Sequence, residues 1–334
     1  RISDYRQICH RELMMNRFKI KIILLLLITI GVSSGMGGDK FTKVGTTGFV
    51  FLEIPVSARS VALGETGIGL MDAGVDGLFF NPALIATQTQ RIAVSATHSD
   101  WYVGTTHQAL ATTIQASSFG TIGFQIINFD FGTITKTRNP TSQEQGSFIE
   151  MGSYSAGASA IGLSFARFMT DRFSFGTTLK YIQENIDIHK ADNVVIDIGF
   201  LYLTGYGNLR IATCLQNFGL ETQYVSEKFK MPQKLTLGMA TEIIGNMNDD
   251  RHVTLMLEAV HPNDIGEHFH LGLEGVLGVI QLRSGYKFGY DDEGFSAGLG
   301  LNTQWGRRQL RMDFSYANHR YLDTTMRYSI MVGL

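Results

Sequence analysis

The sequence predicts an all-β protein, a transmembrane antiparallel β-barrel of about fourteen strands. Three observations lead to it: a short secretory leader, side chains that alternate between apolar and polar from about residue 90 to residue 334, and an unusual composition. Glycine makes up 37 of the 334 residues, and charged residues make up 17%, against about 25% in typical soluble domains. The formal net charge of -2 creates no field that would attract nucleic acid.

Residues 1–35 are expected to be an upstream extension followed by a cleaved signal peptide. A basic stretch at residues 15–21 precedes an apolar run at residues 22–30, and small residues follow as far as Gly35. This order is typical of a secretory signal, and the apolar run is shorter than the roughly 20 residues of a membrane helix. Translation is expected to start at Met14 or Met15 and cleavage to fall near Gly35, with an uncleaved anchor as the alternative.

Residues 90–334 are expected to form the barrel. In the last segment Tyr328, Ile330 and Val332 alternate with Arg327 and Ser329, so a strand there has one apolar face and one polar face. About fourteen such segments can be counted, each of roughly ten residues, which is the length of a tilted membrane strand. Their centres lie near residues 94, 111, 125, 161, 178, 199, 211, 238, 256, 272, 284, 299, 313 and 330.

The connections between these segments alternate in length, as they do in outer-membrane barrels with short periplasmic turns and longer outer loops. Short connections are expected at residues 117–120, 169–172, 205–208, 278–280 and 304–307. Longer ones are expected at residues 131–153, 183–193, 217–232, 289–294 and 317–324. The turn at residues 245–250 falls at a position where a short periplasmic turn is expected, and it is longer than such turns usually are.

A soluble sandwich or propeller would also alternate with period two. Its apolar face would then be the core, and its outer face would carry dense charge. Here the polar face is rich in glycine, serine and threonine, which suits a hydrated or plugged lumen better than a packed core. The apolar face, with leucine, isoleucine, phenylalanine and tyrosine, is typical of a lipid-facing band. The membrane barrel is therefore favoured, in the outer membrane of a Gram-negative-type bacterium.

Residues 36–89 do not alternate and carry a separate motif. An Ala-Arg pair is followed by a glycine-rich turn, an acidic residue, and an aromatic residue with Asn-Pro-Ala after it. The residues are Ala58, Arg59, Gly64, Gly67, Asp72 or Asp76, Phe80, Asn81, Pro82 and Ala83. This run resembles the N-terminal signature of the PorV/PorQ family of outer-membrane proteins, which is itself similar to the FadL-type transporters of hydrophobic compounds. Leu84 stands where that family usually has glycine, and Phe80 where tryptophan or tyrosine is common.

The resemblance implies a fourteen-stranded barrel whose N-terminal segment, residues 36–89, folds into the lumen as a hatch, with the Asn-Pro-Ala turn near the barrel wall. Glycines permit tight turns in a confined space, and Asn-Pro favours the start of a turn. An ordinary cluster of periplasmic turns is the alternative. A buried Arg59 would need a carboxylate such as Asp72 or Asp76 as its partner.

No dinucleotide fingerprint, P-loop or catalytic spacing is present. A metal site is geometrically conceivable where His268, His270 and Glu274 share a face with His252 and Glu258 of the preceding strand, but any polar lumen gives the same pattern. No enzymatic activity, cofactor or metal is therefore expected. The polar face of the C-terminal strands should form a luminal network that braces barrel and hatch, because opposite charges on neighbouring strands pair. Its members are His252, Glu258, His268, His270, Glu274, Arg283, Lys287, Arg311 and Asp313. Further charges expected on the inner face are Arg172, Lys180, Asp197, Arg210, Lys234 and Glu242.

Two functions remain open. The PorV-like resemblance suggests an accessory or cargo-handling component of type IX-like protein secretion, with secretion-system proteins or secreted cargo as partners. The alternative is a FadL-like channel for small hydrophobic molecules. In both cases the barrel contacts outer-membrane lipid and no nucleic acid. The outer loop at residues 131–153 favours the first hypothesis, since it lacks a long apolar surface.

Overall fold

The computed structural model describes residues 44–142, 146–224, 226–306 and 308–334. The predicted extension, signal peptide and cleavage site lie outside these residues. Among the described residues, no helix is both long enough and apolar enough to cross a bilayer.

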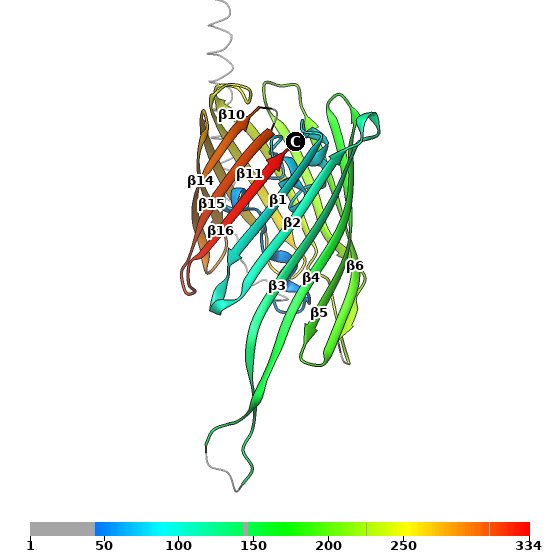
Figure 1. Cartoon of the computed structure of the whole chain (residues 1–334), viewed down its shortest axis with the longest axis vertical. Coiled ribbons are helices and arrows are strands. Elements are labelled where there is room, and N and C mark those ends of the chain that lie inside the picture. The colour runs from blue at the N-terminus through cyan, green and yellow to red at the C-terminus, as the bar shows by residue number, and fades with distance from the viewer. Residues whose placement is uncertain (1–43, 143–145, 225, 307) are drawn as a thin grey trace, which may run out of the picture.

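Fourteen strands of the described chain form one closed antiparallel barrel (Figure 1). All fourteen predicted centres fall within these strands, so the predicted fold class is confirmed. The strands are β1 (Ile92–Asp100), β2 (Thr106–Gln115), β3 (Thr121–Arg138), β4 (Ile149–Thr170), β5 (Phe173–Ile186), β6 (His189–Leu203), β7 (Arg210–Gly219), β10 (Lys234–Ile244), β11 (Arg251–Pro262), β12 (His268–Leu277), β13 (Ile280–Phe288), β14 (Glu293–Trp305), β15 (Arg308–His319) and β16 (Thr325–Gly333). A separate two-stranded sheet pairs β8 (Thr222–Tyr224) with β9 (Glu227–Phe229).

The barrel has two unlike ends. The turn end holds the start of β1, the end of β16 and the predicted short connections, one of which contains the 3-10 turn η5 (Ser117–Phe119). The loop end holds the β1–β2 turn with η4 (Tyr102–Gly104) and the longer connection that carries β8 and β9. By the rule for outer-membrane barrels, the turn end faces the periplasm.

Two predicted long loops are wrong. Residues 183–193 are mostly strand, since β5 and β6 continue as a ladder that pairs Ile186 with His189. Residues 131–153 are likewise largely a β-hairpin, because β3 and β4 still pair at Arg138 and Ile149. This hairpin projects beyond the barrel rim (Figure 1). Outside lipid both faces of a strand can be polar, so the alternation that marks membrane strands fades although the hydrogen bonds continue.

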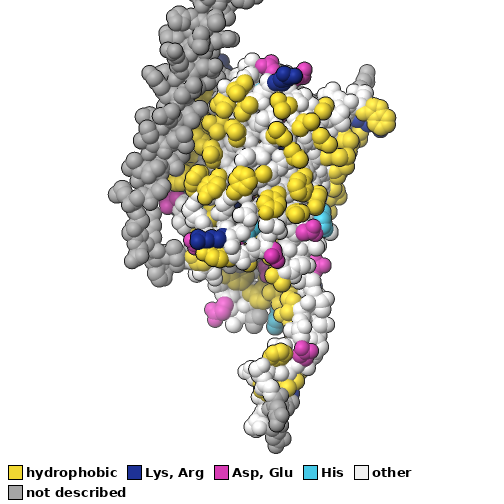
Figure 2. Space-filling view, turned by 90° about the vertical axis from the view of Figure 1, so that its left-hand side faces the viewer, with side chains coloured by type: hydrophobic (Ala, Val, Ile, Leu, Met, Phe, Trp, Pro, Cys, Tyr) yellow, Lys and Arg dark blue, Asp and Glu magenta, His cyan; other side chains and the backbone are white. Residues whose placement is uncertain are grey.

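The two faces of each strand divide as predicted. In β16, Thr325, Arg327, Ser329 and Met331 are buried inside, while the residues between them point outward. Leucine, isoleucine and aromatic side chains cover the exterior, and Figure 2 shows them crowded along the side of the barrel with charges mostly near its two rims. Only a closed ladder satisfies all backbone groups in lipid, which is why an apolar exterior and a closed sheet occur together.

Residues 48–88, which precede β1, lie within the barrel (Figure 1). Their helical elements are η1 (Val50–Glu53), α2 (Ala58–Ala62), η2 (Gly74–Phe79) and η3 (Pro82–Thr87). We call residues 48–88 the luminal segment. It holds three clusters of buried apolar residues against the inner faces of the strands.

Candidate functional site

The luminal segment crosses the barrel from the loop end to the turn end. At the loop end, the backbone N–H of Gly48 donates to the carbonyl of Lys230 over 3.0 Å. At the turn end, Thr113 of β2 donates to the side chain of Gln88. Between these points, α2 contacts β13 to β16, and η3 contacts β3 to β6. The segment therefore touches opposite walls of the lumen with different elements.

Arg59 ties α2 to the wall formed by β11 to β16. Its side chain is 2% exposed and donates to both carboxylate oxygens of Asp72 at 2.9 Å. It also donates to Glu274 of β12, at 2.9 Å from Nε and 2.6 Å from Nη2. Such charge-assisted, forked bonds are among the strong ones in proteins.

The ion pairs continue along the wall. Arg283 of β13 bonds Glu274 at 2.6 Å and Asp313 of β15 at 2.6 Å. Arg311 then bonds Asp313 at 3.0 Å and returns to the luminal segment through Asp76 at 2.6 Å.

Asp72, Arg59, Glu274, Arg283, Asp313, Arg311 and Asp76 thus form one chain of alternating charge, which we call the ionic chain. It begins and ends on the luminal segment. Breaking one member would leave an uncompensated buried charge, which costs about 3–5 kcal/mol in comparable buried pairs. The ionic chain therefore holds α2 and η2 in a fixed place against β12, β13 and β15.

The wall also approaches the segment closely with its backbone. Gly64 has a left-handed conformation, with φ of +69°, and a Cβ at Gly285 of β13 would collide with its backbone nitrogen. Next to it, the carboxylate of Glu258 accepts hydrogen bonds from the N–H groups of Gly67 and Ile68, at 2.6 and 2.9 Å. Glycines on both partners make this approach possible, since a side chain would fill the gap.

The Asn-Pro-Ala turn packs against β5 and β6. The Asn81 amide donates to the carbonyl of Ile68 at 2.8 Å and to that of Phe200 at 3.3 Å, while its oxygen caps η3 by accepting from Ala83 at 3.1 Å. Side chains at Gly176 or Gly199 would overlap this turn. No ion pair of the described chain joins the turn to this wall, so it is held by hydrogen bonds and close packing.

The wall from β2 to β6 combines small apolar residues with buried polar side chains such as His107 and Gln125, and it carries the Lys180–Asp197 ion pair within itself. Ala109, Ala158, Ala160 and Ala191 line it, and Phe51 of the luminal segment belongs to the same buried cluster. Where this wall reaches the loop end, a cleft of about 520 Å³ opens. Five aromatic rings from the luminal segment, β3, β8 and β9 line it, together with the side chains of Glu184 and Glu227; we call it the aromatic cleft, and its rings are Phe49, Phe51, Phe131, Tyr224 and Phe229.

A smaller pocket of about 220 Å³, with apolar and charged residues in its lining, lies on the other side of the luminal segment at the same end. Glu65 and Lys287 line it and are bonded at 2.5 Å, and Lys287 also contacts Glu293. Burial raises the pKa of Glu65, but the neighbouring Lys287, His270 and Lys234 together outweigh burial and leave the pKa at about 2. Tyr290 covers Lys287, with the ammonium 4.4 Å from the ring centre.

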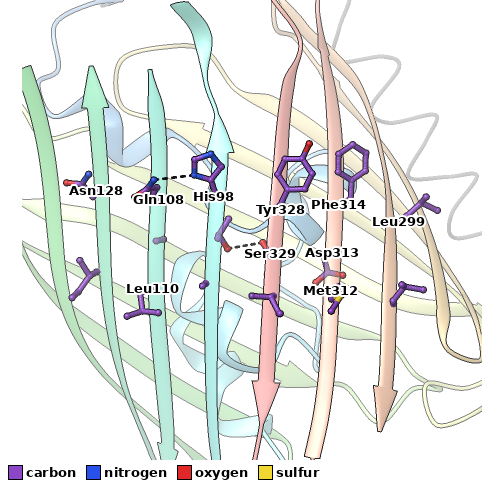
Figure 3. Close-up of a pocket in the computed structure, with 16 residues that line it drawn as sticks. His98, Gln108, Leu110, Asn128, Leu299, Met312, Asp313, Phe314, Tyr328 and Ser329 are labelled. Atoms are coloured by element: carbon purple, nitrogen blue, oxygen red, sulfur yellow. Dashed lines mark hydrogen bonds between the residues drawn. The ribbon is translucent and has the colours of Figure 1, made fainter. Parts of the chain in front are cut away.

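The outer wall also carries a groove of about 830 Å³ over β14, β15, β16, β1, β2 and β3. Leu299, Met312, Phe314 and Leu110 line it, and His98, Gln108 and Asn128 stand along one edge (Figure 3). This groove lies on the apolar exterior of the barrel, the face that is typical of contact with lipid, and it is separate from the lumen.

The predicted luminal residues separate into groups. Glu274, Arg283, Arg311 and Asp313 belong to the ionic chain, and Glu258 and Lys287 bond other parts of the luminal segment. His268 and His270 pack on Tyr290, with rings 4.0 and 5.5 Å away. His252 instead bonds the carbonyl of Asp249 in a turn. Among the described residues no group of three or more potential ligands is placed to hold a metal ion.

One expectation about a charged residue needs correction. Arg172 was expected on the inner face, but it lies exposed in the β4–β5 turn beside Gly205, since the strand ends before it. Of the two carboxylates offered as partners for Arg59, Asp72 bonds it, and Asp76 bonds Arg311. In a closed barrel, strands distant in sequence become neighbours, and the arginine of β15 reaches Asp76.

Sequence reasoning missed the aromatic cleft. A signal was present in β3, where Phe129 and Phe131 occupy the inward phase of the alternation, on which polar and small residues are otherwise common. Phe49 lies ahead of the Ala58–Arg59 motif, and Phe229 lies in a connection without any alternation. Only the folded chain brings these rings together.

No protein-family model matches the sequence, and no characterised protein matches it significantly. Solved structures do match in fold. The monoaromatic hydrocarbon channel CymD has a TM-score of 0.56 and 11% identity over 86% of this chain and 97% of that chain. The Pseudomonas putida toluene transporter TodX has a TM-score of 0.51 and 12% identity over 83% and 96%. A Pseudomonas aeruginosa FadL homologue has a TM-score of 0.52 and 10% identity over 83% and 97%.

At these identities the likeness establishes the fold, which is that of FadL-type hydrocarbon channels. The closed barrel, its apolar exterior and this fold place the chain in the outer membrane of a Gram-negative-type bacterium.

Proposed function

We propose that the protein is a channel through which small hydrophobic molecules enter the outer membrane from the cell surface. The aromatic cleft carries the proposal. It opens at the loop end, its volume is within the range of about 300–1,000 Å³ typical of small-molecule sites, and five aromatic rings line it. A ring-shaped or short-chain apolar molecule would bury its surface there with offset and edge-on contacts.

The asymmetry of the lumen suggests the route beyond the cleft. The ionic chain fixes the luminal segment to β12, β13 and β15, where displacement would expose buried charges. The opposite wall, from β2 to β6, offers alanines to the segment, and among the described residues no ion pair joins this wall to it. An apolar molecule would therefore pass along the β2–β6 wall by displacing η1 from it. The luminal segment would then act as the hatch.

The fold supports this proposal over the secretion hypothesis. Two structures with the same fold are named as a hydrocarbon channel and a toluene transporter. None of the structures named above is a secretion component, and the PorV/PorQ resemblance depends on residues 51–84 alone.

Uptake of labelled toluene by cells that express the protein tests the proposal. The double variant Phe131→Asp, Phe229→Asp should lower the protein-dependent uptake at least tenfold, or about 1.4 kcal/mol, because a toluene ring cannot displace water from carboxylates. Phe148→Asp is the matched control, since Phe148 lies on the projecting hairpin with 54% of its side chain exposed. Outer-membrane amounts of each variant must be equal. Unchanged uptake by the double variant would rule out the aromatic cleft as the entrance.

A further inference from the structure

The aromatic cleft carries two carboxylates beside its rings. Glu184 comes from β5 and Glu227 from β9, and both line the cleft. Neither has an ion-pair partner in the described part of the chain. No lysine or arginine of the described residues lines the cleft either. The charges that the described chain presents to the cleft are therefore negative only.

Both carboxylates are neighbours of residues that supply the rings. The backbone N–H of Phe49 donates a hydrogen bond to Glu184. Burial and the negative charge of Glu184 raise the pKa of the Tyr224 hydroxyl, so this carboxylate acts on Tyr224 as well. Tyr224 in turn stands opposite Glu227 in the two-stranded sheet of β8 and β9. The negative charge is thus placed next to the aromatic surface.

The rings form a connected surface that favours the same sign of charge in a ligand. Phe49 contacts Phe51 with ring centres 6.5 Å apart, and it contacts Phe229 with centres 5.9 Å apart. Tyr224 extends this series, with its ring centre 6.4 Å from that of Phe229. The face of an aromatic ring is negative, so it attracts a cation that lies over it within about 6 Å. Rings and carboxylates would therefore act together on a positively charged group.

We propose that the aromatic cleft selects hydrophobic molecules that carry a positive charge, namely amines and quaternary ammonium compounds with an aryl or alkyl group. The apolar part would lie on the rings, and the ammonium group would lie against Glu184 and Glu227. A cation compensates carboxylates that no cation of the described chain pairs, whereas a hydrophobic anion is repelled by them and a neutral hydrocarbon gains nothing from them. This inference rests on the proposed function, because it names the substrate class that the same cleft would admit.

Equilibrium dialysis of the barrel in phosphatidylcholine nanodiscs tests the selection with two labelled probes of the same shape. Benzyltrimethylammonium is a cation, and neopentylbenzene has carbon in place of its nitrogen. Empty nanodiscs, dialysed in parallel, correct for probe that dissolves in the lipid. The double variant Glu184→Gln, Glu227→Gln should weaken binding of the cation at least tenfold, or about 1.4 kcal/mol, and should change binding of the neutral probe less than twofold.

Glu150→Gln, at an exposed position of the projecting β3–β4 hairpin, is the matched control and should bind both probes as the wild-type chain does. If the double variant does not fold, Glu227→Gln alone, at an exposed position of β9, should weaken binding of the cation about threefold and leave the neutral probe unaffected.

The outcomes separate this inference from the proposed function. Binding of the cation that is unchanged in the double variant would overturn the inference, and so would an equal loss of both probes, because the carboxylates would then only support the shape of the cleft. A wild-type chain that binds neopentylbenzene but not benzyltrimethylammonium would also overturn it, while the proposed channel for hydrophobic molecules would stand. If the wild-type chain binds neither probe, the aromatic cleft is not an entrance, and both proposals fail.

Discussion

Glu65 belongs to the luminal segment, and its ionisation depends on Lys287 of the barrel wall. Lys287 projects from β13 and holds this carboxylate ionised in a buried place, where burial alone would favour the neutral acid. The folded pKa of about 2 lies below the ordinary value of 4.5. The ion pair therefore stabilises the fold fully above the ordinary pKa, and this stabilisation is lost as the pH falls toward the folded pKa.

Replacing Glu65 by glutamine should lower thermal stability at neutral pH and have little effect near pH 2. The difference in unfolding midpoint between wild type and Glu65→Gln should shrink as the pH falls from about 4.5 to about 2, because the wild-type carboxylate becomes protonated in that window. Heat-dependent migration on gels, measured across this pH range, gives the midpoints. Glu227→Gln, at an exposed position of β9, is the control. If the difference in unfolding midpoint between wild type and Glu65→Gln did not change with pH, Glu65 would stabilise the fold by packing alone.

Asn81 is the residue on which the η3 turn depends. It is fully buried, and its side chain makes three hydrogen bonds that join Ile68, Ala83 and the carbonyl of Phe200 in the wall. An N-cap contributes about 1 kcal/mol, and each buried group left without a partner costs about 1–3 kcal/mol more. The barrel strands themselves lose nothing when this side chain is removed.

At the scale of elements, the luminal segment should therefore loosen before the barrel does. Asn81→Ala should leave the amount of protein in the outer membrane unchanged but raise the labelling rate of Cys214 by a thiol reagent at least tenfold, or about 1.4 kcal/mol. Cys214 is a buried free thiol of β7 in the cluster that contains Leu63, Ala83 and Leu84, so it becomes accessible when η3 moves. Pro82→Gly should act in the same direction, because it releases the restricted backbone of the turn.

Asn208→Ala, in an exposed turn, is the matched control for Cys214 labelling. Site-resolved mass spectrometry distinguishes Cys214 from Cys9. Equal labelling rates in Asn81→Ala and wild type would mean that η3 is held by packing and that the segment is not a movable hatch at this point. If Asn81→Ala were instead missing from the outer membrane, the η3 turn would be needed for assembly of the barrel.

At the scale of the molecule, closure of the barrel depends on β16, which pairs with β15 on one side and with β1 on the other. Deleting residues 330–334 would remove the pairs that join Ala96 to Ile330 and Val94 to Val332, together with their counterparts on β15. Open edges in lipid leave backbone groups unpaired, at a cost of several kcal/mol each.

The truncated chain should therefore fail to give the compact, heat-modifiable band that closed barrels show on gels without boiling. Ile330→Ala with Val332→Ala is the control, since it shortens two outward side chains but keeps the whole backbone ladder. A compact band from the truncated chain would show that β16 is not needed for closure, and recovery of the wild-type chain in a soluble fraction would contradict the membrane assignment.

The amino-acid sequence alone determined the strands, their inward and outward faces and the closed membrane barrel. It could do so because successive side chains of a strand point to opposite faces, and lipid requires one of those faces to be apolar. Where the chain leaves lipid, as in the β3–β4 hairpin, that requirement ends, and the predicted loops were wrong. Arg172 was misplaced for a related reason, since alternation does not show the residue at which a strand gives way to its turn.

Only the tertiary structure decided which groups meet inside the barrel. Arg59 bonds Glu274, 215 residues away in the chain, and Asp76 pairs with Arg311 across 235 residues. The rings of the aromatic cleft come from four separate elements. Charge and polarity in the sequence predict that buried ions need partners, but the partners are selected by barrel closure and by the path of the luminal segment, which place residues distant in sequence within hydrogen-bonding distance.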